Sequence, residues 1–239
     1  MFMATLMSLS CAFAGGAMPF QSDTVKTSAG DLVMTFIGHG TLMLRAGDVV
    51  IHVDPWTKFT DYRDMPKADI ILVTHEHRDH LDADAITHLR TDGTEVLLTA
   101  ACREALGAGT VMANGDSVEL HGLRIDAVPA YNVKHTRGNG APFHPRGEGN
   151  GYVITFGDTR VYIAGDTEDI PEMAALKDID IAFLPMNLPY TMTPEMAAHA
   201  AKMCKARIVY PYHYGSTDPR ELVELLAEDD TEVRVRELR

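Results

Sequence analysis

The chain has 239 residues, enough to bury the core of one α/β domain, and 46% of them are hydrophobic. Its formal net charge of −13 argues against a nucleic-acid partner, because affinity for nucleic acid comes largely from lysine and arginine side chains that neutralise phosphates. The cysteines Cys11, Cys102 and Cys204 form no CxxC pair, so the sequence indicates neither a cysteine zinc site nor a disulfide framework.

The first twenty residues carry no charged side chain, and Ala12-Phe13-Ala14 fits the small-x-small cleavage pattern of a signal peptide. No lysine or arginine precedes Lys26, however, so the basic region of such a peptide is missing. We therefore predict that residues 1–20 are either an export signal, which would direct the protein to the periplasm or the cell exterior, or a disordered extension of a cytoplasmic protein. The apolar run is too short to predict a membrane span.

Residues 31–239 are predicted to form one domain, rich in short strands bounded by glycine turns. The predicted strands cover residues 32–37, 41–44, 49–53, 70–73, 95–99, 118–120, 123–128, 152–156, 160–164, 179–184 and 207–210. Helices are predicted over residues 83–89 and 194–206, the second with Thr193 as its N-cap and Pro194 at its first position. Residues 136–150 are a glycine-rich loop, and the sequence shows no internal repeat.

The densest group of possible metal ligands lies in residues 74–80, between the apolar strand 70–73 and the helix 83–89. It contains His75, His77, Asp79 and His80. Alternate residues of an extended segment point the same way, so His75 and His77 can bind one ion together. Asp79 and His80 follow as the chain turns and can face a second ion, since imidazole and carboxylate are common ligands of zinc and iron. The alternative is a solvated loop that is rich in histidine.

This stretch resembles the His-x-His-x-Asp-His signature of the metallo-β-lactamase superfamily. Further segments resemble other elements of that superfamily, in the same order: Gly38-His39-Gly40-Thr41, Ile51-His52-Val53-Asp54-Pro55-Trp56, Ala164-Gly165-Asp166-Thr167 and Tyr210-Pro211-Tyr212-His213-Tyr214-Gly215. The branch looks similar to the small hydrolases related to ascorbate-6-phosphate lactonase and N-acylphosphatidylethanolamine phospholipase D. The resemblance implies a four-layer αββα sandwich with a metal site at one edge of its two sheets.

The resemblance also implies two divalent metal ions, with zinc as the default and manganese or iron as alternatives. One ion would be bound by His75, His77 and a further histidine, and the second by Asp79, His80 and His213. Asp166 would bridge the two ions.

The identity of the further histidine is open in the sequence. The phospholipase-like relatives carry it where this chain has Asn132, and both His135, just before the glycine-rich loop, and His144, within it, are available. We favour His144, because Phe143-His144-Pro145 resembles the pattern of the closer relatives.

The function implied is hydrolysis of an ester, lactone or phosphodiester of a small molecule by a metal-bound hydroxide, with Asp79 as general base. Asp54 is predicted to orient a ligand histidine, and His39 to line the site or hold its loop. Asn187 and Tyr190 are candidates for substrate contact. The alternatives are a non-catalytic metal-binding protein, an oxidoreductase of the flavodiiron type and a true β-lactamase. The sequence does not predict an oligomeric state.

Overall fold

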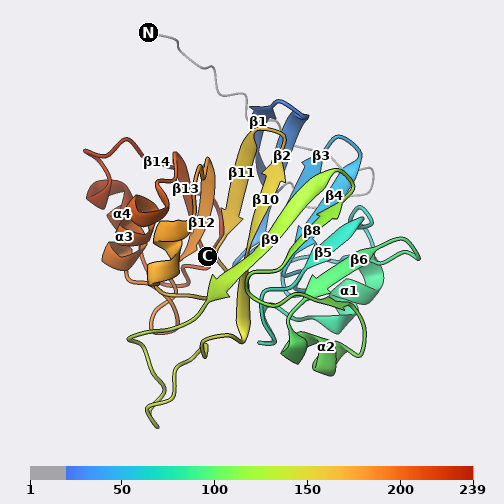
Figure 1. Ribbon diagram of the computed structural model, residues 1–239, viewed down its shortest axis with the longest axis horizontal. Helices are drawn as coiled ribbons and strands as arrows, with labels where there is room; N and C mark the ends of the chain where they lie inside the picture. The colour runs from blue at the N-terminus through green and yellow to red at the C-terminus, as the bar shows by residue number, and fades with distance from the viewer. Residues whose placement is uncertain (1–19, 239) are drawn as a thin grey trace.

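The computed structural model describes residues 20–238 as two seven-stranded sheets packed face to face. Helices α1 and α2 cover the outer face of one sheet, and helices α3 and α4 lie on the outer side of the other (Figure 1). The four layers are therefore helix, sheet, sheet and helix, which confirms the predicted αββα sandwich.

The N-terminal sheet has its strands in chain order. Its first four strands pair antiparallel, and the strands from the fourth to the seventh pair parallel. A parallel step needs a long crossover, and α1 (Ala83–Leu89) and α2 (Ala100–Leu106) lie in two of these crossovers. The strands are β1 (Gln21–Thr27), β2 (Gly30–Gly38), β3 (Thr41–Ala46), β4 (Val49–Val53), β5 (Ile70–Leu72), β6 (Glu95–Leu98) and β7 (Thr110–Val111).

The C-terminal sheet repeats this arrangement, with four antiparallel strands followed by parallel pairing from its fourth strand onward. Its strands are β8 (Ser117–Leu120), β9 (Leu123–Ala130), β10 (Gly149–Phe156), β11 (Thr159–Ile163), β12 (Ile181–Pro185), β13 (Ile208–Tyr212) and β14 (Glu232–Val233). Its helices are the 3₁₀ helix η1 (Pro171–Ala175), α3 (Pro194–Cys204) and α4 (Arg220–Leu225). The two halves of the chain thus share one topology.

The main hydrophobic core contains residues of both sheets and of α3, and a second core lies between the first sheet and helices α1 and α2. Strands β5 and β12 are buried along their whole length, as expected for parallel strands covered on both faces. Thr193 caps α3 by accepting a hydrogen bond from the backbone N–H of Met196, as predicted.

Each predicted strand is present, with ends that differ by at most three residues. The sheet begins at Gln21, however, and not at the predicted domain start, residue 31, because β1 pairs with β2 along its whole length. This strand has no buried residue, so it lacks the apolar alternation that identifies a strand in sequence. The short elements α2, β7, η1, α4 and β14 were also missed.

No helix between residues 20 and 238 is long and apolar enough to cross a bilayer. The prediction of an export signal concerns residues 1–20, of which residues 1–19 lie outside the described part of the chain.

Candidate metal centre

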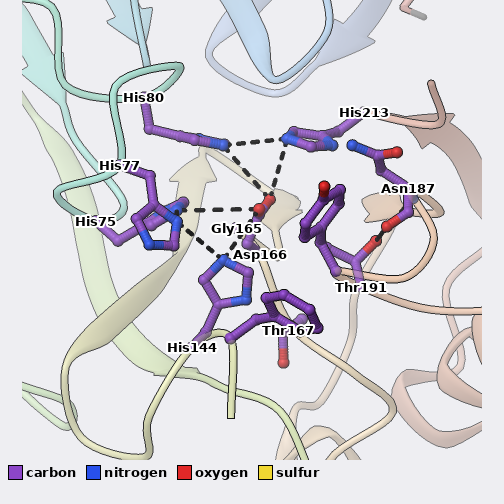
Figure 2. Close-up of polar contacts among 12 residues, drawn as sticks. His75, His77, His80, His144, Gly165, Asp166, Thr167, Asn187, Thr191 and His213 are labelled. Atoms are coloured by element: carbon purple, nitrogen blue, oxygen red, sulfur yellow. Dashed lines mark hydrogen bonds and ion pairs between the residues drawn. The ribbon is translucent and has the colours of Figure 1, made fainter. Parts of the chain in front are cut away.

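The predicted ligands meet at one edge of the sandwich, beyond the carboxyl ends of the parallel strands, and Figure 2 labels all of them except Asp79. The loop after β5 supplies His75, His77, Asp79 and His80, and the turns after β11 and β13 supply Asp166 and His213. His144 comes from the long loop between β9 and β10. Polar side chains meet there because these strands of both sheets end at this edge, and this is where open α/β sheets usually bind ligands.

Three histidines form the first group. His77 Nδ1 lies 3.0 Å from His75 Nε2 and 3.2 Å from His144 Nε2. Asp166 Oδ2 lies 3.3 Å from His144 Nε2 and 3.9 Å from His75 Nε2. Three imidazole nitrogens and one carboxylate oxygen thus face a common point.

Two histidines and two carboxylates form the second group. His80 Nε2 and His213 Nε2 are 3.2 Å apart, and they lie 3.6 and 3.5 Å from Asp166 Oδ1. Asp79 Oδ2 lies 3.5 Å from His213 Nε2 and 3.8 Å from His80 Nε2. The two oxygens of Asp166 therefore face different groups, as Figure 2 shows for the histidines.

The donor set fits divalent cations. Asp166 Oδ1 is buried and has no hydrogen-bond partner among the described residues. A buried carboxylate oxygen without a partner is costly unless a cation compensates it. Nitrogen donors with hard oxygen donors are typical of zinc, manganese and iron sites.

The electrostatics prepare part of the first group for metal binding. Burial lowers the pKa of His75 well below its usual value, and burial also lowers the pKa of His77. Both rings are therefore neutral near pH 7, and a neutral imidazole is the form that binds a metal.

In the second group, carboxylates control the charge. Burial opposes protonation of His80, but the carboxylates of Asp166 and Asp54 raise the pKa of His80 to about 9 in the protein without metal. Burial disfavours an ionised Asp79, but hydrogen bonds with His213 and His39 hold the pKa of Asp79 well below its usual value. The group thus carries ionised carboxylates that attract cations.

Comparison with known proteins places the chain in a family. Residues 33–213 match the model of the beta-lactamase superfamily domain. The chain belongs to the beta-lactamase superfamily.

Relatives of this superfamily member are named as metal-dependent hydrolases. This chain is 31% identical over 211 residues to a UPF0173 metal-dependent hydrolase of Thermococcus kodakarensis, and the match covers 81% of this chain and 91% of the relative. A solved structure from Parabacteroides distasonis, assigned as a metal-dependent hydrolase, is 51% identical, with a TM-score of 0.88 over 92% of this chain and 100% of that one. A metallo hydrolase of Ignicoccus hospitalis is 27% identical, with a TM-score of 0.72 over 87% of this chain and 95% of that one. This member of the beta-lactamase superfamily is a metal-dependent hydrolase.

In this hydrolase, Asp54 holds the second group in place. Its side chain is fully buried, and Asp54 Oδ2 lies 2.8 Å from His80 Nδ1. It also accepts hydrogen bonds from the backbone N–H of Thr74 (2.8 Å) and from the Thr74 hydroxyl (2.7 Å). With a proton on His80 Nδ1, Nε2 is the nitrogen that faces Asp166 and His213, and it is the one that a cation can bind once its own proton is released. Asp54 is therefore in contact with a candidate ligand histidine, and its orienting role stays a prediction.

His39 lies beside the second group of the superfamily site. Its Nε2 is 3.1 Å from Asp79 Oδ2, and its ring centroid is 3.6 Å from that of His213. His39, Asp54 and His213 all have positive φ angles, of 56°, 42° and 46°. Such backbone conformations are strained for non-glycine residues and cluster at functional sites.

The structure brings His144 to the cluster and places His135 elsewhere. His135 Nδ1 lies 2.8 Å from the backbone oxygen of Thr191 and 3.0 Å from Glu168 Oε1. His144 is buried, and Asn132 Oδ1 lies 2.8 Å from His144 Nδ1. Asn132 and Glu168 were not predicted as site residues. The only sequence signal was that Asn132 stands where relatives carry a histidine.

Asn187 and Tyr190 lie on one loop at the side of the site. Asn187 is near His213 in Figure 2, and its side chain packs against Gly215. Tyr190 is 44% exposed and packs edge-on against Phe143, with ring centroids 5.0 Å apart. Phe143 itself lines a hollow together with His75, His77 and His144. Tyr190 is thus at the rim, one side chain away from the candidate ligands.

Proposed function

We propose that this hydrolase binds two divalent cations side by side, with zinc as the default, and hydrolyses an ester, lactone or phosphodiester of a small molecule. The position of Asp166 supports this proposal most strongly. Its two carboxylate oxygens face separate groups of imidazole nitrogens, and one oxygen has no other partner among the described residues. A carboxylate in this position can bridge two cations about 3.5–4 Å apart.

The proposed ligands follow from the two groups. One cation would be bound by His75, His77, His144 and Asp166 Oδ2, and the other by Asp79, His80, His213 and Asp166 Oδ1. When bound, such cations lower the pKa of water and stabilise negative charge that develops on the substrate.

The protein's own groups supply orientation and proton transfer. Asp79 has 32% of its side chain exposed, whereas His80, Asp166 and His213 have between 0% and 4% exposed. The Asp79 carboxylate is therefore accessible to solvent and is placed to accept a proton as a general base. His39, 3.1 Å from Asp79 Oδ2, would hold that carboxylate in position.

The test is Asp166→Asn, with metal content and hydrolysis measured together. We expect the wild-type protein to contain about two equivalents of divalent metal per chain. The Asn variant should lose most of both metal equivalents, because an amide cannot neutralise two cations. It should also lose hydrolysis of p-nitrophenyl esters and bis-p-nitrophenyl phosphate.

Asp92→Asn is the matched control, since Asp92 is exposed in a turn between α1 and β6. This variant should keep its metal and its activity. Full metal content and activity in Asp166→Asn, or a wild-type protein that binds no metal on titration, would contradict the proposal.

A further inference from the structure

Glu168 is a buried carboxylate that the proposed ligand set does not use. Its side chain is fully buried, and it accepts hydrogen bonds from three successive backbone N–H groups. The N–H groups of Val133 and Lys134 donate to Oε2 (2.8 and 2.6 Å), and that of His135 donates to Oε1 (2.6 Å). Burying an ionised carboxylate is costly, so such a dense set of donors indicates a specific role.

The fourth donor to Glu168 is the side chain of Asn132. Asn132 Nδ2 donates to Glu168 Oε1 (3.0 Å) and to the backbone oxygen of Tyr190 (2.8 Å). Both partners are acceptors only, so the amide can adopt one orientation, with Nδ2 toward Glu168 and Oδ1 toward the metal centre.

The orientation of this amide fixes the proton on His144. Asn132 Oδ1 accepts hydrogen bonds from the backbone N–H of His144 and from its ring Nδ1–H, both at 2.8 Å. An amide oxygen cannot donate, so in the neutral ring His144 Nδ1 carries the proton and Nε2 presents its lone pair. Asp166 Oδ2, 3.3 Å from Nε2, would by itself favour a proton on Nε2. Asn132 opposes that tautomer.

We propose that Glu168 and Asn132 are positioning residues that hold His144 in its metal-binding tautomer. Glu168 fixes the Asn132 amide, and Asn132 fixes the ring and the proton of His144. Partners of this kind orient metal-binding histidines, and their loss typically weakens metal binding 10- to 100-fold. The inference rests on the proposed role of His144 as a ligand, but the tautomer can be measured without any metal.

The first experiment uses the metal-free protein labelled with ¹⁵N-histidine. Long-range ¹H–¹⁵N spectra distinguish the two tautomers, and the His144 signal is assigned by its absence in His144→Gln. We expect the Nδ1–H tautomer in the wild-type protein. In Asn132→Leu, which removes the acceptor at similar volume, His144 should shift toward the Nε2–H tautomer, because Nδ1 loses its acceptor while Nε2 keeps Asp166 Oδ2 at 3.3 Å. In Glu168→Gln, the Asn132 amide keeps only the Tyr190 backbone oxygen as its fixed acceptor, so its orientation is held less firmly and His144 should show both tautomers.

Glu172→Gln is the matched control. Glu172 is a neighbouring carboxylate that accepts from the Tyr131 hydroxyl and pairs with Arg146, and no hydrogen bond joins it to Asn132. The Glu172→Gln variant should leave the tautomer of His144 unchanged. Competition with a chelator should then show zinc binding weakened about 10- to 100-fold in Asn132→Leu and Glu168→Gln only.

An unchanged Nδ1–H tautomer in both test variants would overturn the inference, as would an Nε2–H tautomer in the wild-type protein. If Glu168→Gln does not fold, the result for Asn132→Leu decides. A wild-type protein that shows the Nδ1–H tautomer but binds no metal would support the positioning of His144 and overturn the proposed function instead.

Discussion

At the scale of single residues, the charge of a buried histidine in this protein depends on its nearest polar neighbours. His75 and His80 are both buried, and their rings lie 4.1 Å apart between centroids. Burial lowers the pKa of His75, whereas the pKa of His80, which lies beside Asp54 and Asp166, is raised to about 9 despite burial. Binding a cation to His80 should therefore release a proton, while His75 is already deprotonated.

His52 is a buried histidine without a carboxylate beside it, and its charge also follows from its nearest polar neighbour. Its ring is fully buried, and Nε2 lies 3.0 Å from the backbone oxygen of Pro66. Burial lowers the pKa of His52 to about 4. The unfolded chain binds a proton here below about pH 6.5, whereas the folded protein does so only below about pH 4. His52 should therefore make the folded state less stable as pH falls from 6.5 to 4, by about 3 kcal/mol in total.

This effect of His52 is measured by comparing the free energies of urea unfolding of the wild-type protein and of His52→Gln at pH 7 and pH 4. Glutamine can still donate to Pro66 but does not titrate. We expect the wild-type protein to lose about 3 kcal/mol more than the variant between these pH values. Parallel losses in the two proteins would show that His52 protonates equally well in the folded state.

At the scale of elements, strand ends decide where the site side chains lie. Asp166 follows β11 through Gly165, whose φ is 67° and whose missing side chain leaves room for the backbone oxygen of Asn150. Strand β10 pairs with β11, and Gly151 of β10 lies against the backbone at the end of β11. A Cβ at Gly151 would lie 2.8 Å from the backbone oxygen of Ala164. The position of Asp166 thus depends on glycines in two neighbouring segments.

We therefore expect Gly151→Ala to force β10 and the end of β11 apart. Because the contact is with backbone, the strain cannot relax by side-chain rotation, and stability should fall by about 1–3 kcal/mol in urea unfolding. Gly138→Ala is the control, since Gly138 is exposed, has no atom within 4 Å of a built Cβ and should change stability by less than about 0.5 kcal/mol. Equal stability of the two variants would mean that β10 and β11 adapt without strain.

At the scale of the whole molecule, the candidate metal centre joins the two halves of the sandwich. The loop after β5 belongs to the first sheet, whereas Asp166, His213 and His144 follow or precede strands of the second sheet. A metal bound between these residues would link the sheets, and a ligand that binds only the folded state stabilises it. The sheets are also joined away from the site, where Asp23 of β1 accepts hydrogen bonds from Tyr210 of β13 (2.5 Å) and from Arg236 (2.6 Å).

Metal removal should therefore lower the stability of the whole domain. At free metal about 1,000 times Kd the stabilisation is about 4 kcal/mol, which corresponds to a Tm difference of about 10 °C for a domain of this size. Calorimetry before and after treatment with a chelator measures it, and added zinc should restore the higher Tm. Asp166→Asn should show little response to the chelator. A wild-type Tm that the chelator does not change would argue against a metal link between the sheets.

The sequence by itself determined the strands with buried or alternating apolar residues and the residue types at their carboxyl ends. These features are local: a strand and the turn after it are encoded within about ten residues, so His75, His77, Asp79 and His80 could be identified as candidates. The resemblance to the metallo-β-lactamase superfamily added Asp166 and His213. Only the tertiary structure showed that His144, and not His135, lies beside the other candidate ligands, because both lie in the long segment between β9 and β10, which has no periodicity. It also revealed the polar edge strand β1 and the shared topology of the two halves. The contacts of Glu168 and Asn132 join residues 36 positions apart, and such contacts form through space once two loops pack together, with no pattern along the chain.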